Sequence, residues 1–280
     1  MPTVLITGSS TGIGEECALR LNRMGWHVFA GVRRGEDGAA LRARSRNKHL
    51  LTPLLLDVTD SASIAAAFQL IRDEVGALGL DGLVNNAGIA VAAPLEFVSL
   101  HDLRRQFEVN VIGPIAVTQA AIPLLRMGHG RVVNIGSVSG RITSPVLGPY
   151  SASKFALDAL TDALRMELRP WHIHVAYVQP AGIRTPIWGK ALADADRTIR
   201  SMPDQAQTLY APTIQHMTGV ATRATRKGAP VSTVGKAVAH ALCSPKPKTR
   251  YLVGKFALVA EILRILPDRL RNHLIMRRFE

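Results

Sequence analysis

Residues 4–14 read Val4-Leu5-Ile6-Thr7-Gly8-Ser9-Ser10-Thr11-Gly12-Ile13-Gly14, and this stretch decides the fold. Its apolar beginning is typical of a buried strand, and a helical pattern follows over residues 12–24. Glycines between a first strand and a first helix permit a tight turn and close approach of the backbone to a pyrophosphate. The helix N-terminus then offers N–H groups to phosphates. We therefore predict a nucleotide-binding turn made by Gly8, Ser10, Thr11, Gly12, Ile13 and Gly14.

The same alternation of short apolar runs and longer helical patterns continues along most of the chain. Strands are expected at residues 4–7, 28–32, 51–57, 82–85, 131–135, 174–178 and 249–253. Helices are expected at residues 12–24, 61–75, 100–127 (two helices or one bent helix), 151–168 and 231–243. Apolar strands joined by helical crossovers predict an α/β fold with a doubly wound parallel sheet of about seven strands and helices on both faces.

Two later segments depart from this alternation. Residues 189–230 are polar and lack strong periodicity, and their place after the sixth strand suits a substrate lid over the carboxyl edge of the sheet, with a passive surface insertion as the alternative. Residues 256–280 form a basic, amphipathic extension that Pro267 is expected to split into two helices. Because no linker or repeat divides the chain, residues 1–280 are expected to form a single domain.

Composition limits the class of protein. Apolar residues make up 47% of the 280 residues, and neither a signal peptide nor a long uninterrupted apolar segment is evident, which predicts a cytoplasmic protein. The two cysteines, Cys17 and Cys243, lack metal-ligand spacing, so we expect no metal site and two buried, inert thiols. The net charge of +13 is not accompanied by a nucleic-acid-binding module, and nucleic acid is not an expected partner.

A phenol and an ammonium are placed one helical turn apart in Tyr150-Ser151-Ala152-Ser153-Lys154. Residues four apart share a helix face, so both side chains can act at one point. A neighbouring cation favours the phenolate, which would lower the pKa of Tyr150 from its ordinary value of about 10 toward the working pH. The pair therefore predicts an acid/base group.

The spacing Gly-x-x-x-Gly-x-Gly, combined with Tyr-x-x-x-Lys, resembles the short-chain dehydrogenase/reductase family, most closely its hydroxysteroid and retinol dehydrogenase branch. The resemblance runs from Thr3 to about Trp188 and includes Asp57, Asn85-Asn86-Ala87-Gly88, Asn110-x-x-Gly113 and Ser137. It implies that Tyr150 is the acid/base at the substrate oxygen and that Ser137 holds that oxygen. It also implies that Lys154 lowers the tyrosine pKa and binds the nicotinamide ribose, and that Asn110 positions a water in a proton relay. Asn110 has an alternative role as a buried amide bonded to neighbouring backbone.

The same resemblance assigns further cofactor contacts. They comprise Asp57 and Val58 after the third strand, Asn86, Ala87 and Gly88 after the fourth, and Pro180, Ile183 and Thr185 after the sixth. The family commonly has glycine directly after the proline, whereas this chain has Ala181 followed by Gly182. This departure concerns the backbone of the loop rather than the reaction.

The choice of dinucleotide can be argued from the end of the second strand. Dinucleotide folds that prefer NAD usually carry an acidic residue there, and this chain has Val32 followed by Arg33 and Arg34. Without that carboxylate a 2'-phosphate meets no repulsion, and either arginine can bind it. NADP(H) is therefore the expected cofactor, with NAD(H) as the second choice.

The substrate is expected to be a small hydrophobic alcohol or carbonyl compound such as a steroid, a retinoid or another lipid. The segment between Ser137 and Tyr150 is apolar, and the expected lid begins with Ile187 and Trp188. The alternatives are a 3-oxoacyl-thioester reductase and a non-catalytic NADP(H) sensor. Family resemblance implies a homodimer or homotetramer. For residues 256–280 the alternatives are an oligomer interface, a pocket wall, attachment to an anionic membrane surface, or an ordinary terminal helix with its apolar side on the core.

Overall fold

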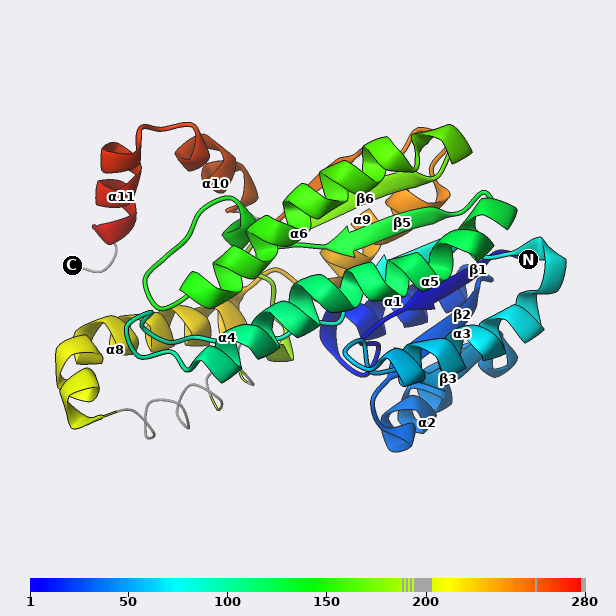
Figure 1. The fold of residues 1–280 in the computed structure, drawn as a ribbon, viewed down its shortest axis with the longest axis horizontal. Coiled ribbons are helices and arrows are strands. Elements are labelled where there is room, and N and C mark those ends of the chain that lie inside the picture. Colours follow the sequence, from blue (N-terminus) through cyan, green and yellow to red (C-terminus); the bar gives the residue numbers. More distant parts are fainter. Residues whose placement is uncertain (188, 190, 192, 194–202, 255, 278–280) are drawn as a thin grey trace.

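The computed structural model describes residues 1–280 except 188, 190, 192, 194–202, 255 and 278–280 (Figure 1). Its centre is a parallel sheet of seven strands in the order β3-β2-β1-β4-β5-β6-β7. The strands are β1 (Thr3–Ile6), β2 (His27–Val32), β3 (Leu51–Leu55), β4 (Gly82–Asn85), β5 (Arg131–Ile135), β6 (His174–Pro180) and β7 (Arg250–Val253). The predicted doubly wound α/β fold is confirmed. Because the strand order reverses between β1 and β4, the carboxyl edge at that point is where ligands are expected to bind.

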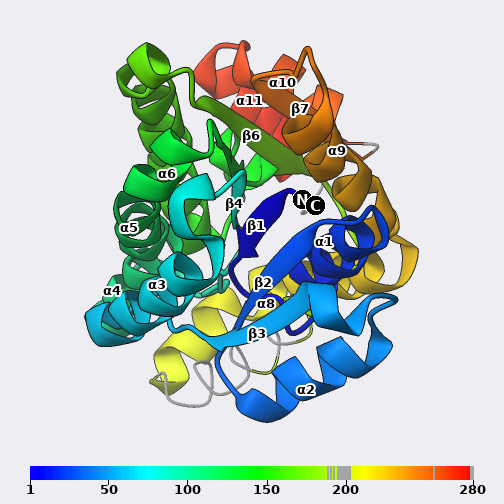
Figure 2. The same cartoon turned by 90° about the vertical axis from the view of Figure 1, so that its right-hand side faces the viewer.

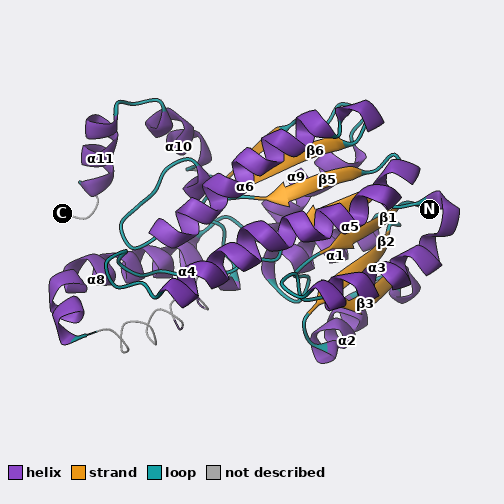
Figure 3. Ribbon diagram, viewed as in Figure 1, coloured by secondary structure: helices purple, strands orange, loops and turns teal. Residues whose placement is uncertain are grey.

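Helices cover both faces of the sheet, as Figure 2 shows along the strands. One face carries α1 (Gly12–Arg23), α2 (Gly35–Arg44) and α9 (Val231–Cys243), and the other carries α3 (Ser61–Val75), α4 (Leu100–Phe107), α5 (Gly113–Met127) and α6 (Gly148–Glu167). Beyond the carboxyl edge lie α8 (Asp204–Lys227), α10 (Ala257–Arg264) and α11 (Asp268–Met276) (Figure 3). Short 3-10 turns are η1 (Lys48–Leu50), η2 (Gly76–Leu78), η4 (Val138–Gly140) and η5 (Arg169–Trp171).

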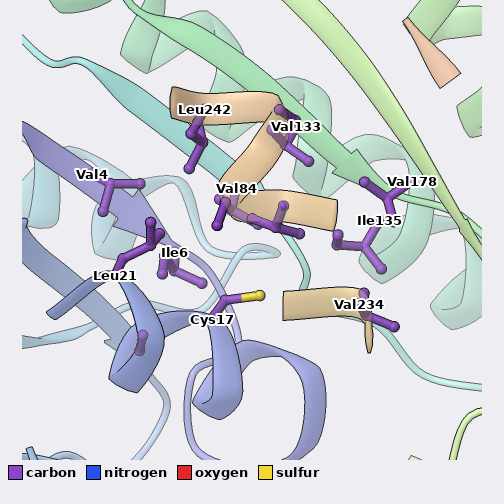
Figure 4. Close-up of a cluster of buried hydrophobic side chains, with 14 of the residues drawn as sticks. Val4, Ile6, Cys17, Leu21, Val84, Val133, Ile135, Val178, Val234 and Leu242 are labelled. Atoms are coloured by element: carbon purple, nitrogen blue, oxygen red, sulfur yellow. The ribbon is translucent and has the colours of Figure 1, made fainter. Parts of the chain in front are cut away.

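The core explains why α1 and α9 lie side by side. Cys17 and Leu21 of α1 and Val234 and Leu242 of α9 are all buried and meet the apolar side chains of the central strands (Figure 4). Cys17 is buried as expected, but Cys243 is exposed, because it is the last residue of α9 and lies past the buried stripe.

Among the described residues, helices α2 and α8 were missing from the sequence prediction. Helix α2 buries only Gly38 and Leu41, so its residues show no apolar stripe. Helix α8 falls inside the segment expected to be a lid without periodicity. Small side chains such as Ala206 and Ala221 are among those it buries, and alanine contributes little to an apolar period. The beginning of the expected lid lies partly outside the described residues.

The expected helix over residues 100–127 is one helix with an irregular middle. Helices α4 and α5 are joined by η3 (Glu108–Ile112), a π-helical turn. Pro114 lacks an N–H group and cannot donate to the carbonyl of Asn110 four residues earlier, which accounts for the irregular bonding. The helix is long and apolar enough to cross a membrane, but half of its apolar window is buried inside the protein, as in the core helix of a soluble protein.

A ladder of polar side chains runs through the core between two central strands. Asn85 on β4 donates to Asn134 on β5 and to Thr118 on α5, both at 2.9 Å. Asn134 in turn donates to Thr161 on α6 at 2.9 Å. All four residues are buried, and these hydrogen bonds satisfy both amide NH2 groups and Asn134 Oδ1, whereas the buried Asn85 Oδ1 has no hydrogen-bond partner among the described residues.

Candidate active site

A cavity of about 240 Å³ opens at the carboxyl edge of the sheet, near the point between β1 and β4 where the strand order reverses. Most of the predicted site residues form its wall: Gly8, Ser10, Thr11, Gly12, Ile13, Arg33, Asp57, Val58, Asn86, Ala87, Gly88, Ser137, Tyr150, Lys154, Pro180, Ile183 and Thr185. Gly14, Arg34 and Asn110 are not part of the wall.

The glycine turn is shaped by contacts that leave no room for side chains. Gly8 has a φ of 66°, a conformation that favours glycine. A Cβ on Gly14 would lie 2.3 Å from the carbonyl oxygen of Gly8, so Gly14 permits close packing although it lies behind the cavity wall. Asn86 Nδ2 donates to the carbonyls of Thr7 and Gly8 at 2.9 and 3.0 Å. The turn is therefore held tightly against the loop after β4.

The N-terminus of α1 is suited to an anionic group. Its N-cap residue, Thr11, makes no side-chain capping hydrogen bond, and Thr11, Gly12 and Ile13 border the cavity. The first N–H groups of a helix have no partner within the helix, and the helix dipole favours negative charge there. This end of the cavity therefore fits the pyrophosphate of a dinucleotide.

The two candidate arginines occupy different environments. Arg33 lines the cavity, and its charge helps to lower the pKa of Asp57. Partial burial opposes that lowering, but hydrogen bonds from Thr59 and the charge of Arg33 outweigh it. Arg34 instead binds Asp37 through two hydrogen bonds of 3.0 Å and pairs with Glu36 at 3.2 Å. Of the two, only Arg33 lines the cavity.

At the other end of the cavity, α6 places Tyr150 and Lys154 on one buried face. Tyr150 is hydrogen-bonded to the side chain of Ser137. The Lys154 ammonium lies 5.9 Å from the centre of the Tyr150 ring and donates to the carbonyl of Ile135 at 2.9 Å. The two groups expected to act on the substrate oxygen, Tyr150 and Ser137, therefore meet at the cavity wall beside Lys154.

The predicted effect of Lys154 on Tyr150 is not seen in this structure. Burial raises the pKa of Tyr150, and the bond with Ser137 only partly offsets that rise. Burial also lowers the pKa of Lys154 to about 8. The reason is desolvation, which penalises the phenolate and the ammonium alike. Tyr150 is thus a neutral phenol at neutral pH, the form that can donate a proton.

Asn110 lies behind the cavity wall, fully buried in the π-helical turn. Its Oδ1 accepts from the N–H of Ile89 at 2.9 Å, and its Nδ2 donates to the carbonyl of Ile89 at 3.0 Å and to Ser153 Oγ at 3.1 Å. The side chain thereby joins the loop after β4 to the helix that carries Tyr150. These contacts match the alternative role of Asn110 as a buried amide bonded to neighbouring backbone.

The loop after β6 is held in place despite its departure from the family pattern. Ala181 is buried and donates to the carbonyl of Val253 at 2.8 Å. Gly182 takes the left-handed conformation, with a φ of 59°. Ala229 accepts from the N–H of Arg184 and donates to the carbonyl of Gly182, both at 2.9 Å, and Ile183 and Thr185 of this loop line the cavity. Trp188 lies outside the described residues.

Sequence reasoning missed supporting residues whose role depends on distant contacts. Tyr177 on β6 donates from its hydroxyl to the carbonyl of Lys154 at 3.2 Å. A Cβ on Gly136 would lie 1.9 Å from the Tyr177 ring, so Gly136 makes room for it. Ile89 and Val109 also line the cavity. In the sequence, Ile89 and Val109 could have been found only because they adjoin the predicted site residues Gly88 and Asn110. No cluster of metal-ligating side chains occurs among the described residues.

Comparison with known proteins gives one consistent family. A family model described as short chain dehydrogenase matches residues 2–196. The NADPH-dependent 3-dehydrocapnine reductase of Ornithobacterium rhinotracheale is 33% identical over 98% of this chain and 96% of its own length. Retinol dehydrogenase 5 of Mus musculus is 34% identical over 90% of this chain and 80% of its own length.

Similarity extends to solved structures. A short-chain dehydrogenase from Sphingobium yanoikuyae in complex with NADPH is 34% identical and superposes with a TM-score of 0.62, covering 68% of this chain and 75% of that chain. These matches include both reductase and retinol dehydrogenase names.

Proposed function

Because the chain belongs to the short-chain dehydrogenase/reductase family, we propose that it is an NADP(H)-dependent oxidoreductase that interconverts an alcohol and a carbonyl on a hydrophobic substrate. The observation that carries the proposal is the meeting of Tyr150, Ser137 and Lys154 at one end of a cavity whose other end holds Arg33. One end suits proton transfer and the other suits an anionic cofactor.

The residues present fit NADP(H). The tight glycine turn and the N-terminus of α1 would hold the pyrophosphate, and Arg33 would bind a 2'-phosphate through charge-assisted hydrogen bonds. Val32 leaves no carboxylate to repel that phosphate. An NADPH-dependent relative and an NADPH complex of another relative support the same choice. When bound, the cofactor supplies or accepts the hydride.

The protein then handles the proton. Tyr150 would donate to the carbonyl oxygen of the substrate during reduction and accept from the alcohol during oxidation. Ser137, which bonds the Tyr150 hydroxyl, would hold the same oxygen in place. Lys154 would bind the ribose hydroxyls and stabilise negative charge that develops on Tyr150. Burial raises the pKa of Tyr150, so its hydroxyl is protonated at neutral pH and can act as the proton donor in carbonyl reduction.

The apolar part of the cavity supports a hydrophobic substrate. Val138 directly follows Ser137 and lines the cavity, and Ile187 lines it and packs against the cluster that contains Tyr150. Apolar side chains beside a small number of polar groups are typical of sites that bind steroids, retinoids or other lipids. The retinol dehydrogenase name of one relative is consistent with this class.

The test is NADPH-dependent reduction of a panel containing retinal, steroid ketones and an acetoacetyl thioester. Tyr150→Phe is expected to lower kcat by about a thousandfold and to leave NADPH affinity, measured by fluorescence titration, nearly unchanged. Tyr251→Phe is the matched control, since it removes a hydroxyl that bonds Lys248 and His240 away from the cavity. Appreciable turnover by Tyr150→Phe would contradict the proposed acid/base role.

The panel also separates the alternatives. Turnover of the thioester with no turnover of retinal or steroids would favour a 3-oxoacyl-thioester reductase. Tight NADPH binding with no turnover of any carbonyl compound would favour a non-catalytic NADP(H) sensor.

A further inference from the structure

Helix α10 packs on the protein through its small and charged residues. Ala257 and Ala260 are buried, and Glu261 faces inward. The Glu261 carboxylate accepts from Gln179 Nε2 at 2.9 Å and pairs with Arg141 at 3.3 Å. Since Gln179 is fully buried on β6, this contact fixes which side of α10 faces the protein.

The opposite face of α10 is apolar and exposed. Leu258 is 64% exposed, Ile262 is 53% exposed, and Ile265 directly after the helix is 73% exposed. Helix α11 continues this surface, because none of its described residues is buried and Leu270, Leu274 and Met276 are all exposed. A surface helix normally shows the reverse arrangement, with its apolar stripe inward. We call the exposed apolar residues of α10 and α11 the C-terminal apolar face.

Positive charge surrounds this face. Arg264 ends α10, Arg269 lies on α11 and Arg277 directly follows it; all three are exposed, with Arg264 also paired to Glu261 at 3.3 Å, and the chain as a whole has a net charge of +13. A symmetric contact with a second copy would bring these arginines together, and like charges across an interface are unfavourable. An anionic surface complements them. Exposed Leu, Ile and Met beside arginine on short helices are typical of segments that lie in the interface of a membrane.

The C-terminal apolar face lies at the same end of the molecule as the cavity. Helix α10 follows the carboxyl end of β7, and Figure 1 shows α10 and α11 at the upper left and α8 at the lower left, all on the side of the sheet to which the strands point. Phe256, the residue before α10, lies next to Gly182, which lines the cavity. Docking through this face would therefore turn the cavity toward the surface that holds hydrophobic molecules.

We propose that the C-terminal apolar face docks this protein on an anionic lipid bilayer. Leu258, Ile262 and Ile265 insert among the lipid chains near the headgroups, and Arg264, Arg269 and Arg277 bind the anionic headgroups. The proposal does not depend on the enzymatic activity, so failure of either one is distinguishable from failure of the other.

The experiment is cosedimentation of the full chain with vesicles of phosphatidylcholine alone and of phosphatidylcholine with phosphatidylserine. We expect binding to the anionic vesicles that weakens with added salt, and little binding to the neutral ones. Ile262→Asp combined with Leu258→Asp is expected to weaken the binding at least about tenfold. Arg269→Gln combined with Arg277→Gln is expected to weaken it less, and only on anionic vesicles.

Leu78→Asp is the matched control, because Leu78 is 79% exposed and lies in η2 at the opposite edge of the sheet. It should leave vesicle binding unchanged. Thermal melting of each variant checks that the fold persists. Equal binding by the Ile262→Asp, Leu258→Asp double variant would overturn the proposal. The proposal would also be overturned if the parent protein did not bind vesicles and the double variant changed its oligomeric state. That result would identify the C-terminal apolar face as a subunit interface.

Discussion

Helices α1 and α10 each follow a parallel strand of the same sheet, yet α1 turns its apolar side chains toward the protein and α10 turns its large apolar side chains toward solvent. Helix α1 buries Cys17, Ala18 and Leu21 and carries Arg20 and Arg23 in its last turn. Helix α10 buries two alanines, directs Glu261 inward and exposes leucine and isoleucine. An apolar stripe therefore predicts that a helix forms. Which face of that helix is buried also depends on the hydrogen-bond and ion-pair partners that neighbouring elements provide. In α10 those neighbours are Arg141 and Gln179.

The α1 end is built to a fixed geometry, and Gly14→Ala tests this with the largest expected effect. The added Cβ would overlap the Gly8 carbonyl, so we expect a loss of at least about 3 kcal/mol in the free energy of unfolding and loss of measurable NADPH binding. Urea unfolding and fluorescence titration measure the two effects. Gly35→Ala, which meets nothing within 4 Å, is the control and should retain both properties. Normal NADPH affinity in Gly14→Ala would contradict the close-packing argument.

The two arginines after β2 test which residue of the cofactor site binds the 2'-phosphate. We expect Arg33→Ala to raise KM for NADPH by about ten- to hundredfold and to leave KM for NADH nearly unchanged, because a charge-assisted bond to the 2'-phosphate is lost. Arg34→Ala is the matched control, since Arg34 binds Glu36 and Asp37. Equal effects of the two substitutions would refute the assignment of Arg33.

Val32→Asp probes the same position from the other direction. A carboxylate at the end of β2 would repel a 2'-phosphate and bind a ribose 2'-hydroxyl, so preference should move toward NADH. The ratio of kcat/KM for the two cofactors measures the shift. An unchanged ratio would remove the argument from Val32.

Helix α6 carries the buried Lys154, which predicts that the rate of catalysis depends on pH. Burial lowers the pKa of Lys154 to about 8, so its ammonium is present below that pH and is lost above it. If the charge assists reduction, kcat/KM should fall roughly tenfold between about pH 7 and about pH 9. Lys154→Arg keeps a charge over this range, and its residual activity should show no such decline. A flat profile for the parent protein would exclude this role of the charge.

The exposed face of α10 should tolerate polar substitutions with little loss in the free energy of unfolding, unlike the closely packed turn before α1. Ile262→Asp is expected to change the free energy of unfolding by less than about 0.5 kcal/mol, because Ile262 already faces solvent. Ala260→Asp on the same helix should cost more than about 1 kcal/mol, since Ala260 is buried. Denaturant unfolding of the two variants compares them. A larger loss for Ile262→Asp would show that the C-terminal apolar face is packed within the protein.

Much of the fold and the cofactor end was predictable from the sequence because the signals are local. The glycine turn, the strand ends and the spacing of Tyr150 and Lys154 each depend on neighbouring residues. The role of Asn110 was not settled, since its partners Ile89 and Ser153 are distant in sequence. The pKa of Tyr150 was misjudged because burial is a tertiary property. Helix α8 was missed because it buries small side chains rather than a regular apolar stripe.

The asparagine ladder in the core has a consequence for folding accuracy. Strands β4 and β5 are buried on both faces, so a shift of one strand along the other would still bury apolar side chains and would meet little penalty from them. Asn85 and Asn134 stand opposite each other in the native pairing and hydrogen-bond there. In a shifted pairing both amides would be buried without this partner. The ladder therefore disfavours shifted pairings of β4 and β5. The loops that follow these two strands carry Asn86 and Ser137 to the cavity, so the correct pairing also fixes where these residues lie.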